Sequence, residues 1–354
     1  MAEASVAGAA TQSGKRARPA ELNVFIGLIA IIIAFELLGW LFIGQSFIAN
    51  RQRLTIIILQ VSTVGIIAVG VTQVIITGGI DLSSGSIVGA TAMIAMSFAQ
   101  ASNAAAPVYP DLLNLPVIIP IAVALGIGMF AGSINGGFIA YTGIPPFIAT
   151  LGMMVTARGV AKWYTNGKPV SFPTEAYASI ANGDFLSFLT LGQLSSKGLN
   201  PVIIFAVVAI LFHLALKYTI YGKHTYAIGS NEEAARVSGI NVERHKVLVY
   251  AIAGLLAGLA ALVVSSKNLT AQAGMGVMYE LDAIAMAVIG GVSLSGGRGS
   301  IIGTVIGAVI FGVIISGFTF LRIDAYYQEM IKGAIIVTAV VADVYRQRRR
   351  GRMR

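Results

Sequence analysis

The side chains in this sequence that are best suited to binding chemistry are uncharged amides and hydroxyls inside long apolar runs. Such groups donate and accept hydrogen bonds without a fixed charge, so they suit a neutral, hydroxyl-rich solute, whereas a carboxylate solute would favour a cationic partner. The alternative is that they hydrogen-bond between helices, where each contributes modestly. Asp81 has two open roles, capping the next helix or lining a gate, and we favour capping. The candidates for a solute pathway are Gln60, Thr63, Gln73, Asp81, Ser83, Asn135 and Thr150.

A second stretch is suited to docking on another protein, because residues 229–239 are polar and lie between two long apolar runs. Ser230 and Glu233 have the S-x-x-E spacing of a capping box, in which both side chains bind free amides at a helix start. Gly239 can then adopt the left-handed backbone conformation that commonly ends a helix. The pattern predicts a helix of about two turns, with a small apolar face made of Ala234, Ala235, Val237 and Ile240.

The sequence contains no recognisable catalytic machinery. The phosphate-binding pattern G-x-x-x-x-G-K-[ST] does not occur, so we do not expect the chain to hydrolyse ATP. It has no cysteine, its three histidines lack metal-ligand spacing, and no nucleophile, base and metal constellation is visible. We therefore predict no catalytic residue, no metal site and no cofactor bound by this chain.

For the isolated Glu36 we favour a hydrogen bond to a neighbouring helix over a role as a coupling carboxylate.

The composition requires a membrane environment. The chain of 354 residues is 56% apolar and only 11% charged, with 41 glycines, whereas soluble domains are about 25% charged. Charge-free runs such as 54–80 and 82–110 exceed the roughly 20 residues that a spanning helix needs, and they are continuous, which disfavours a β-barrel. The net charge of +9 gathers in the two tails and in the loop 217–246. Beside spanning helices, such charge is typical of topology signals and not of nucleic-acid binding.

These patterns predict an all-α, polytopic integral membrane protein of about ten transmembrane helices with broken or re-entrant segments. The predicted ranges are 24–44, 54–77, 84–100, 115–140, 146–164, 201–221, 246–266, 281–294, 299–321 and 325–345. The fifth range suits a partial helix as well as a span, and the last carries Glu329 and Lys332 at a spacing that allows an ion pair between them. The first range is too long for a cleaved signal peptide, so we read it as an uncleaved helix.

An even number of helices places both termini on one side, and the basic tails make that side cytoplasmic. The predicted domains are a cytoplasmic tail at 1–23, a transmembrane domain at 24–345 that contains a cytoplasmic loop at 222–245, and a basic cytoplasmic tail at 346–354. The loops 101–114 and 165–200 then face outward. Arg51 and Arg53 also fall on the outward side, which counts mildly against this topology.

Glycines recur at four-residue spacing in several ranges, and such small-xxx-small faces let helix backbones approach closely in lipid. Examples are Gly128, Gly132 and Gly136 in one range and Gly254 and Gly258 in another. An internal echo adds to this pattern, because residues 78–89 resemble residues 290–303. Glycine-interrupted apolar segments at matching positions in two halves indicate a transport pathway lined by broken helices. The ten-helix count places both echoes on the cytoplasmic side, so either the repeat is not inverted or one span is wrong.

Several motifs together resemble a known family. Glu233-Ala-Ala followed by Gly239 looks like the EAA-x3-G coupling loop of ATP-binding-cassette (ABC) importer permeases, and five further motifs resemble the ribose/xylose/myo-inositol branch of bacterial sugar permeases. The resemblance covers roughly residues 50–340, and Ser84 stands where the first motif commonly has Val. The five motifs are Thr77-Gly-Gly-Ile-Asp-Leu-Ser-Ser-Gly-Ser, Asn135-Gly-Gly-Phe-Ile-Ala, Gly143-Ile-Pro-Pro-Phe-Ile-Ala-Thr-Leu-Gly-Met, Ala227-Ile-Gly-Ser-Asn and Ile289-Gly-Gly-Val-Ser-Leu-Ser-Gly-Gly-Arg-Gly-Ser.

The resemblance implies a permease subunit in the bacterial inner membrane that carries a monosaccharide or cyclic polyol into the cytoplasm. It implies three kinds of partner: a cytoplasmic subunit that uses ATP and Mg, a periplasmic sugar-binding protein, and a second permease copy. A stand-alone secondary transporter or channel for a neutral solute is the alternative, and it would need no docking loop. By the resemblance, the coupling helix is formed by Gly229, Ser230, Asn231, Glu232, Glu233, Ala234, Ala235 and Gly239.

Overall fold

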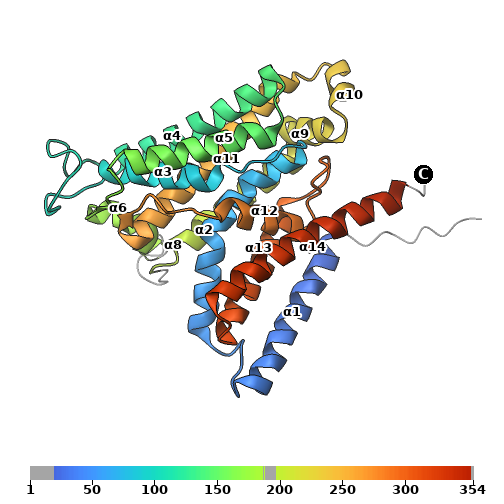
Figure 1. The fold of residues 1–354 in the computed structure, drawn as a ribbon, viewed down its shortest axis with the longest axis horizontal. Helices are drawn as coiled ribbons and strands as arrows, with labels where there is room; N and C mark the ends of the chain where they lie inside the picture. The colour runs from blue at the N-terminus through green and yellow to red at the C-terminus, as the bar shows by residue number, and fades with distance from the viewer. Residues whose placement is uncertain (1–19, 186, 188–196, 352–354) are drawn as a thin grey trace, which may run out of the picture.

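Each of the ten ranges contains a helix in the computed structural model, which describes residues 20–185, 187 and 197–351 (Figure 1). The basic residues Lys15, Arg16, Arg18, Arg352 and Arg354 lie outside the described residues. The ten helices are α1 (Ala20–Phe42), α2 (Arg51–Ile76), α3 (Ser84–Ser97), α4 (Ile118–Gly137, continued by the π-helix η1, Phe138–Thr142), α5 (Pro146–Trp163), α8 (Asn200–Tyr218), α11 (Val242–Asn268), α12 (Tyr279–Ile289), α13 (Ile301–Phe320) and α14 (Ala325–Gly351). The predicted all-α membrane fold is confirmed.

Within the described residues, five shorter elements join these helices. They are α6 (Glu175–Asn182), α9 (Ile220–Ser230), α10 (Glu232–Val237), β1 (Val170–Ser171) and β2 (Thr270–Ala271). The two strands pair antiparallel, with Val170 opposite Ala271. The sheet therefore ties the loop after α5 to the end of α11, although these segments lie far apart in the sequence.

Six of the described helices are long and apolar enough to cross a membrane: α1, α2, α4 with η1, α8, α11 and α13. Helix α3 has only 14 residues and α12 only 11, so they rise about 21 Å and 17 Å and fall short of a hydrocarbon core of about 30 Å. Both are the broken segments that the sequence predicts, and both are mostly buried among longer helices.

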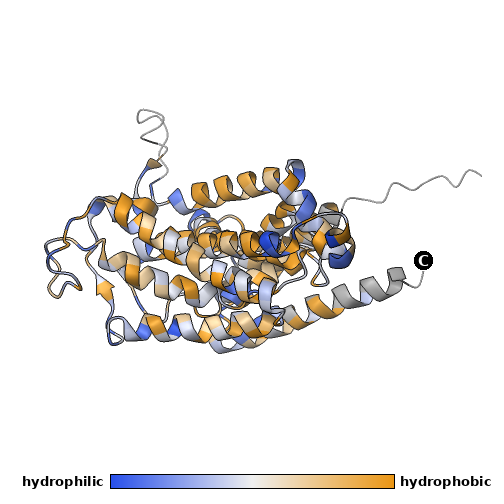
Figure 2. Ribbon diagram, turned by 90° about the horizontal axis from the view of Figure 1, so that it is seen from above, coloured by the Kyte–Doolittle hydropathy of each residue, from blue (hydrophilic) through white to orange (hydrophobic). Residues whose placement is uncertain are grey.

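The bundle has two distinct ends. One, the loop end, contains α9, α10 and the turns 77–83 and 290–300; Gly297 in the second turn donates its amide to the Ile76 carbonyl at 2.8 Å. The other, the sheet end, contains β1, β2, α6 and the loop 101–114, where Ala101 donates to the Phe172 carbonyl at 2.9 Å. Hydrophobic residues dominate the long helices between them, and hydrophilic residues gather at the ends (Figure 2). The described parts of the two loops predicted to face outward, 101–114 and 165–185, therefore lie together, opposite the loop 222–245.

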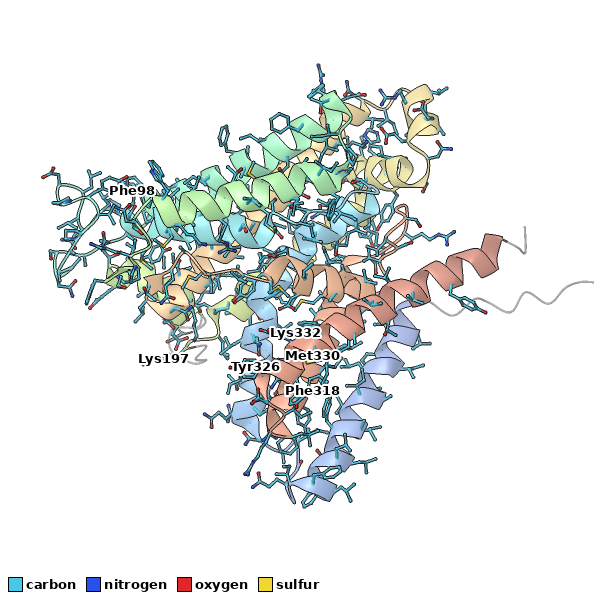
Figure 3. All side chains as sticks on the ribbon, in the orientation of Figure 1. Phe98, Lys197, Phe318, Tyr326, Met330 and Lys332 are labelled. Atoms are coloured by element: carbon cyan, nitrogen blue, oxygen red, sulfur yellow. The ribbon has the colours of Figure 1, made fainter. Side chains whose placement is uncertain are left out.

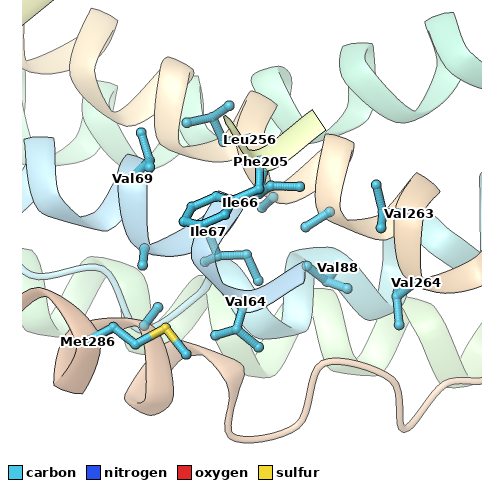
Figure 4. Packing of buried hydrophobic residues seen from close by; sticks show 14 of the residues in the cluster. Val64, Ile66, Ile67, Val69, Val88, Phe205, Leu256, Val263, Val264 and Met286 are labelled. Atoms are coloured by element: carbon cyan, nitrogen blue, oxygen red, sulfur yellow. The ribbon is translucent and has the colours of Figure 1, made fainter. Parts of the chain in front are cut away.

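The centre of the bundle forms around α2, which is fully buried from Val64 to Ile76. Val64, Ile67 and Val69 of α2 lie among side chains from α3, α8, α11 and α12 (Figure 4). Gly65 leaves the space that the Phe205 ring of α8 occupies, since a Cβ there would lie 2.6 Å from that ring. A helix that is apolar on all sides is expected to be surrounded in this way.

Glycines let the backbones of α4 and α11 approach each other closely. A Cβ on Gly128 would overlap the Gly254 carbonyl oxygen, and one on Gly132 would overlap the Tyr250 carbonyl oxygen. The predicted close packing of backbones is therefore confirmed within this chain.

Replacing Gly132 by Ala should lower the thermal unfolding temperature in detergent, because the obstacle is backbone and cannot rotate away. Overpacking of this kind costs about 1–3 kcal/mol. Gly126→Ala in the same helix is the matched control, since a Cβ there meets nothing within 4 Å and alanine favours a helix by about 1 kcal/mol. An unfolding temperature equal for the two variants would contradict the proposed packing role.

Candidate functional site

Helix α10 stands at the loop end between α9 and α11, and it is shorter than the sequence predicts. It is capped by Asn231, whose side-chain oxygen accepts from the Ala234 amide at 3.0 Å. The predicted cap, Ser230, is wrong: its hydroxyl donates back to the Tyr226 carbonyl at 2.7 Å and so belongs to the last turn of α9. Gly239 has the predicted left-handed backbone, with φ of 85°.

The apolar face of α10 divides between the bundle and the exterior. Ala235 is buried against Ile228 and Val242, and Ile240 packs on the same cluster. Val237 points away and is 88% exposed, while Ala234 is also exposed. The prediction of a single docking face is therefore wrong in part, because one side of the helix anchors it and the opposite side is free.

Ion pairs fix α10 to the start of α11. The Glu232 carboxylate lies 2.7 Å from Lys246 Nζ and 3.5 Å from the Arg236 guanidinium. Arg236 also donates to the Glu243 carboxylate, which raises the pKa of Arg236 above its ordinary value. Within the described residues, no cation lies close enough to pair with Glu233, which is exposed. Glu233 is thus the acidic residue of α10 that is available to a partner.

Helix α9 connects this loop to the interior through a glycine junction. A Cβ on Gly229 would overlap the Ile76 carbonyl oxygen at the end of α2 and would lie 2.6 Å from the Gly297 amide nitrogen. A Cβ on Gly296 would lie 2.7 Å from the Gly229 carbonyl oxygen and 3.0 Å from the Gly78 nitrogen. We call these contacts between α9, the end of α2 and the turn 290–300 the junction. Helix α9 is therefore in direct contact with both turns.

The two segments with similar sequences, 78–89 and 290–303, meet at the junction. In each of them one helix ends, a glycine with positive φ follows (Gly78 at 82°, Gly291 at 89°), and the next helix leaves in the opposite direction. Helices α2 and α12 run toward the loop end, whereas α3 and α13 run away from it (Figure 1). These segments therefore share one orientation, as the ten-helix count requires, and are not inverted copies.

Three of the predicted pathway residues form one buried cluster before α3. Asp81 accepts from the Ser83 amide at 2.8 Å and from the Ser83 hydroxyl at 2.6 Å, and Asn135 of α4 donates to that hydroxyl at 2.8 Å. Asp81 is not the cap of α3, whose capping position is held by Ser83 without a side-chain cap. The cluster fixes the turn between α2 and α3 to α4.

Two other predicted residues bind backbone or neighbouring helices. Thr150 donates to the Pro146 carbonyl within α5 at 2.8 Å, beside the Ile80 carbonyl. Gln73 is fully buried; its amide donates to the Val69 carbonyl at 3.0 Å and accepts from the Tyr221 hydroxyl of α9 at 2.8 Å. Gln73 therefore joins α2 to α9 close to the junction.

Gln60 and Thr63 lie apart from these residues, on a cavity of about 370 Å³ between α2, α12 and α14. Lys332 of α14, labelled in Figure 3, lies on this cavity 3.5 Å from the Asp282 carboxylate of α12. The predicted pairing of Lys332 with Glu329 is thus wrong, because a more deeply buried carboxylate on α12 competes for the ammonium. The seven predicted residues do not form one site.

The sequence analysis did not identify Arg158, an arginine of α5 that binds the segment between β2 and α12. Arg158 of α5 donates to the Ala273 and Met275 carbonyls at 2.6 and 2.8 Å. Glu280 of α12 is buried nearby, and its carboxylate occupies the space that a Cβ on Gly85 would fill. The signal was a single arginine inside an apolar helix, since such a charge needs partners within the bundle. The hydrogen bond favoured for Glu36, to a neighbouring helix, is wrong: Glu36 accepts the Phe47 and Ile48 amides of the turn after α1 at 2.8 and 3.0 Å, and the Trp40 ring nitrogen of its own helix at 2.9 Å.

Comparison with known proteins identifies the family. Residues 53–340 match the family described as "Branched-chain amino acid transport system / permease component". The chain belongs to this permease family. No solved structure matches it.

Named relatives match nearly the whole chain. It is 38% identical to the galactose/methyl galactoside import permease protein MglC of Escherichia coli K12 over 324 residues, which cover 90% of this chain and 92% of that protein. It is 39% identical to the ribose import permease protein RbsC of Haemophilus influenzae, with 92% and 93% covered. The identity to RbsC of Bacillus subtilis 168 is 38%, with 91% and 92% covered. The resemblance stated from the motifs is thereby confirmed.

Proposed function

We propose that this chain is the membrane permease of a bacterial monosaccharide importer that is driven by a separate ATP-binding subunit. The observation that carries the proposal is the junction, which links the exposed helix α10 through α9 to both turns between broken helices. Asn231 and the ion pairs of Glu232 and Arg236 make α10 a rigid unit on α11. A push on α10 is then transmitted inward and biases the bundle between two states, with ATP as the separate energy source.

The substrate follows from two independent lines of support. The relatives are named as import permeases for galactose and ribose. The polar groups on the cavity beside α2 include an amide, a hydroxyl and a charged pair. Together they favour a neutral ring with several hydroxyls. Xylose and myo-inositol share this chemistry, but none of the relatives compared above names them.

The remaining parts of the proposal concern partners and orientation. A cytoplasmic ATPase that uses Mg, a periplasmic sugar-binding protein and a second copy of this permease complete the importer, with this chain in the inner membrane. Both termini, the tails 1–23 and 346–354 and the loop 222–245 then face the cytoplasm. In the structure α1 begins, and α14 ends, on the side of the bundle where α10 stands (Figure 1), which supports this orientation.

Glu233→Ala should abolish ATP-dependent uptake while leaving the protein in the membrane, because Glu233 is exposed and pairs with no cation in the described structure. Uptake is measured in proteoliposomes containing the permease, its ATPase and the binding protein. Glu175→Ala, in α6 at the sheet end, is the matched control and should transport normally. Unchanged uptake by the Glu233 variant, or uptake driven by a proton gradient without ATP, would contradict the coupling proposal.

Gly239→Val should give the same loss for a different reason. Its φ of 85° is unfavourable for a β-branched residue, so the turn from α10 to α11 must change. The comparison variant is Gly239→Asn, since Asn tolerates the left-handed region and should retain most of the uptake. Equal uptake by the two variants would show that transport does not depend on the left-handed conformation of this turn.

A further inference from the structure

Two cavities follow one another along α2. The first, of about 520 Å³, lies where α2 begins and α13 ends, and the second, of about 370 Å³, lies deeper between α2, α12 and α14. Gln60 lines both. Both volumes fall in the range of small-molecule sites, about 300–1,000 Å³. The first cavity is lined in part by Gln45, Asn50, Gln52, Arg53, Thr319 and Arg322.

The residues of α2 on these cavities lie along one stripe of the helix. At about 100° per residue, Gln52, Ile56, Gln60 and Thr63 fall within an arc of about 80°, and Arg53 and Val64, which also line the cavities, extend it to about 120°. Ile58 points the other way, about 160° from Gln60, and is 46% exposed. Gln52 and Thr63 are about 16 Å apart along the helix axis. The stripe therefore connects the start of α2, beside the end of α13, to the interior of the bundle.

The connection is closed toward the loop end. Every residue of α2 from Val64 to Ile76 is buried, and neither cavity is lined by a residue of α2 beyond Val64, so the lining ends about 18 Å before the junction. This arrangement is expected of a solute path that is open at one side of a membrane and sealed at the side where ATP-driven movement arrives.

Three charged side chains line the deeper cavity, which is unusual for a surface in contact with lipid chains. The side chains of Asp282 and Lys332 are only 13% and 23% exposed, and Glu329 lines the same space. Ionisable groups at membrane depth are costly unless they face a water-filled cavity or a partner. Asp282 and Lys332 pair with each other, but Glu329 forms no ion pair within the described residues, so the lining favours water and a hydrated solute.

The polar groups suit a ring with several hydroxyls. The amide of Gln60 both donates and accepts, and the ion pair beside it offers charge-assisted hydrogen bonds to hydroxyl groups. At the entrance, the Arg53 guanidinium lies 3.9 Å from the Phe320 ring centroid and donates to the Phe47 carbonyl at 2.9 Å, which fixes the Arg53 side chain on the wall of the first cavity.

We infer that the stripe Gln52, Ile56, Gln60 and Thr63 lines the monosaccharide path, with Gln60 as the residue that passes the sugar from the outer to the inner cavity. This inference rests on the proposed function. It places Asp81, Ser83 and Asn135 outside the path, as part of the turn that responds to the junction.

The absence of cysteine in the chain allows a direct test. Gln52→Cys, Gln60→Cys and Thr63→Cys are each introduced into the full importer complex and treated with a small charged thiol reagent, which reacts only where water reaches. All three variants should be labelled, and millimolar ribose or galactose should slow labelling at positions 60 and 63 at least about threefold. Ile58→Cys, on the opposite face of α2, is the control and should remain unlabelled.

Absence of labelling at positions 60 and 63, or labelling at position 58 equal to theirs, would overturn the path. Labelling that neither sugar slows would overturn its assignment to a monosaccharide. The reaction needs no ATP, so its outcome is separate from that of the coupling proposal: failed ATP-dependent uptake with intact, sugar-sensitive labelling would refute the proposed energy source and leave the path standing.

Discussion

Replacing Gly229 by Ala should reduce ATP-dependent uptake about a hundredfold, although the new residue adds a single methyl group. That methyl would overlap the Ile76 carbonyl oxygen and lie 2.6 Å from the Gly297 nitrogen, so α9 cannot keep its place on the junction. Strain from overpacking reaches about 3 kcal/mol, and each 1.4 kcal/mol is worth a factor of ten. Uptake in proteoliposomes and ATP hydrolysis by the complex are measured together.

The direction of this effect is opposite to what helix propensity alone predicts. Alanine is about 1 kcal/mol better than glycine inside a helix, so α9 by itself should gain stability. Gly152→Ala in α5 is the matched control, because a Cβ there meets nothing within 4 Å, and it should transport normally. Normal uptake by the Gly229 variant as well would show that the junction does not transmit movement.

Replacing Arg158 by Met should destabilise the protein by roughly 3 kcal/mol, because two carbonyls lose their charge-assisted hydrogen bonds and the positive charge near the buried Glu280 carboxylate is removed. The structure brings the Ala273 and Met275 carbonyls within 2.8 Å of the guanidinium. The unfolding temperature of the purified protein in detergent, and its yield from membranes, are the measurements. Both should fall clearly below those of wild type.

A second substitution separates charge from packing at this site. Glu280→Gln alone should be mild, and added to Arg158→Met it should recover part of the lost stability, since the buried charge is then gone. Such non-additivity is expected of groups that act on each other. Strictly additive effects of the two substitutions would mean that Arg158 acts through the carbonyls alone.

The sequence was informative wherever a pattern was local. Continuous apolar runs located the helices, because an α-helix satisfies its own backbone in lipid whereas the strands of a barrel would alternate in polarity. The spacing of Gly128 and Gly132 indicated a close helix contact, which the structure makes with α11. The left-handed stop at Gly239 was likewise predictable from residue type. Each of these inferences needs only neighbours in the chain.

Choices between competing partners were not predictable in the same way. Ser230 and Asn231 are both good caps, and only the geometry of α9 decides that Asn231 holds the position. Lys332 pairs with Asp282, which lies 50 positions earlier in the sequence. The pathway residues presented the same difficulty, because polar type alone does not separate Asn135, bound to Ser83, from Gln60 on a cavity.

The central claim is that α10 receives the force of an ATP-binding subunit, and Val237 offers the most direct test of it. This side chain is 88% exposed at the loop end, so a photo-crosslinking amino acid placed there in native membranes should form a covalent adduct with the partner. The account predicts an adduct with an ATP-binding subunit, identified by mass spectrometry, whose yield changes when ATP is added. Adducts with lipid alone, together with uptake that requires a proton gradient, would contradict it.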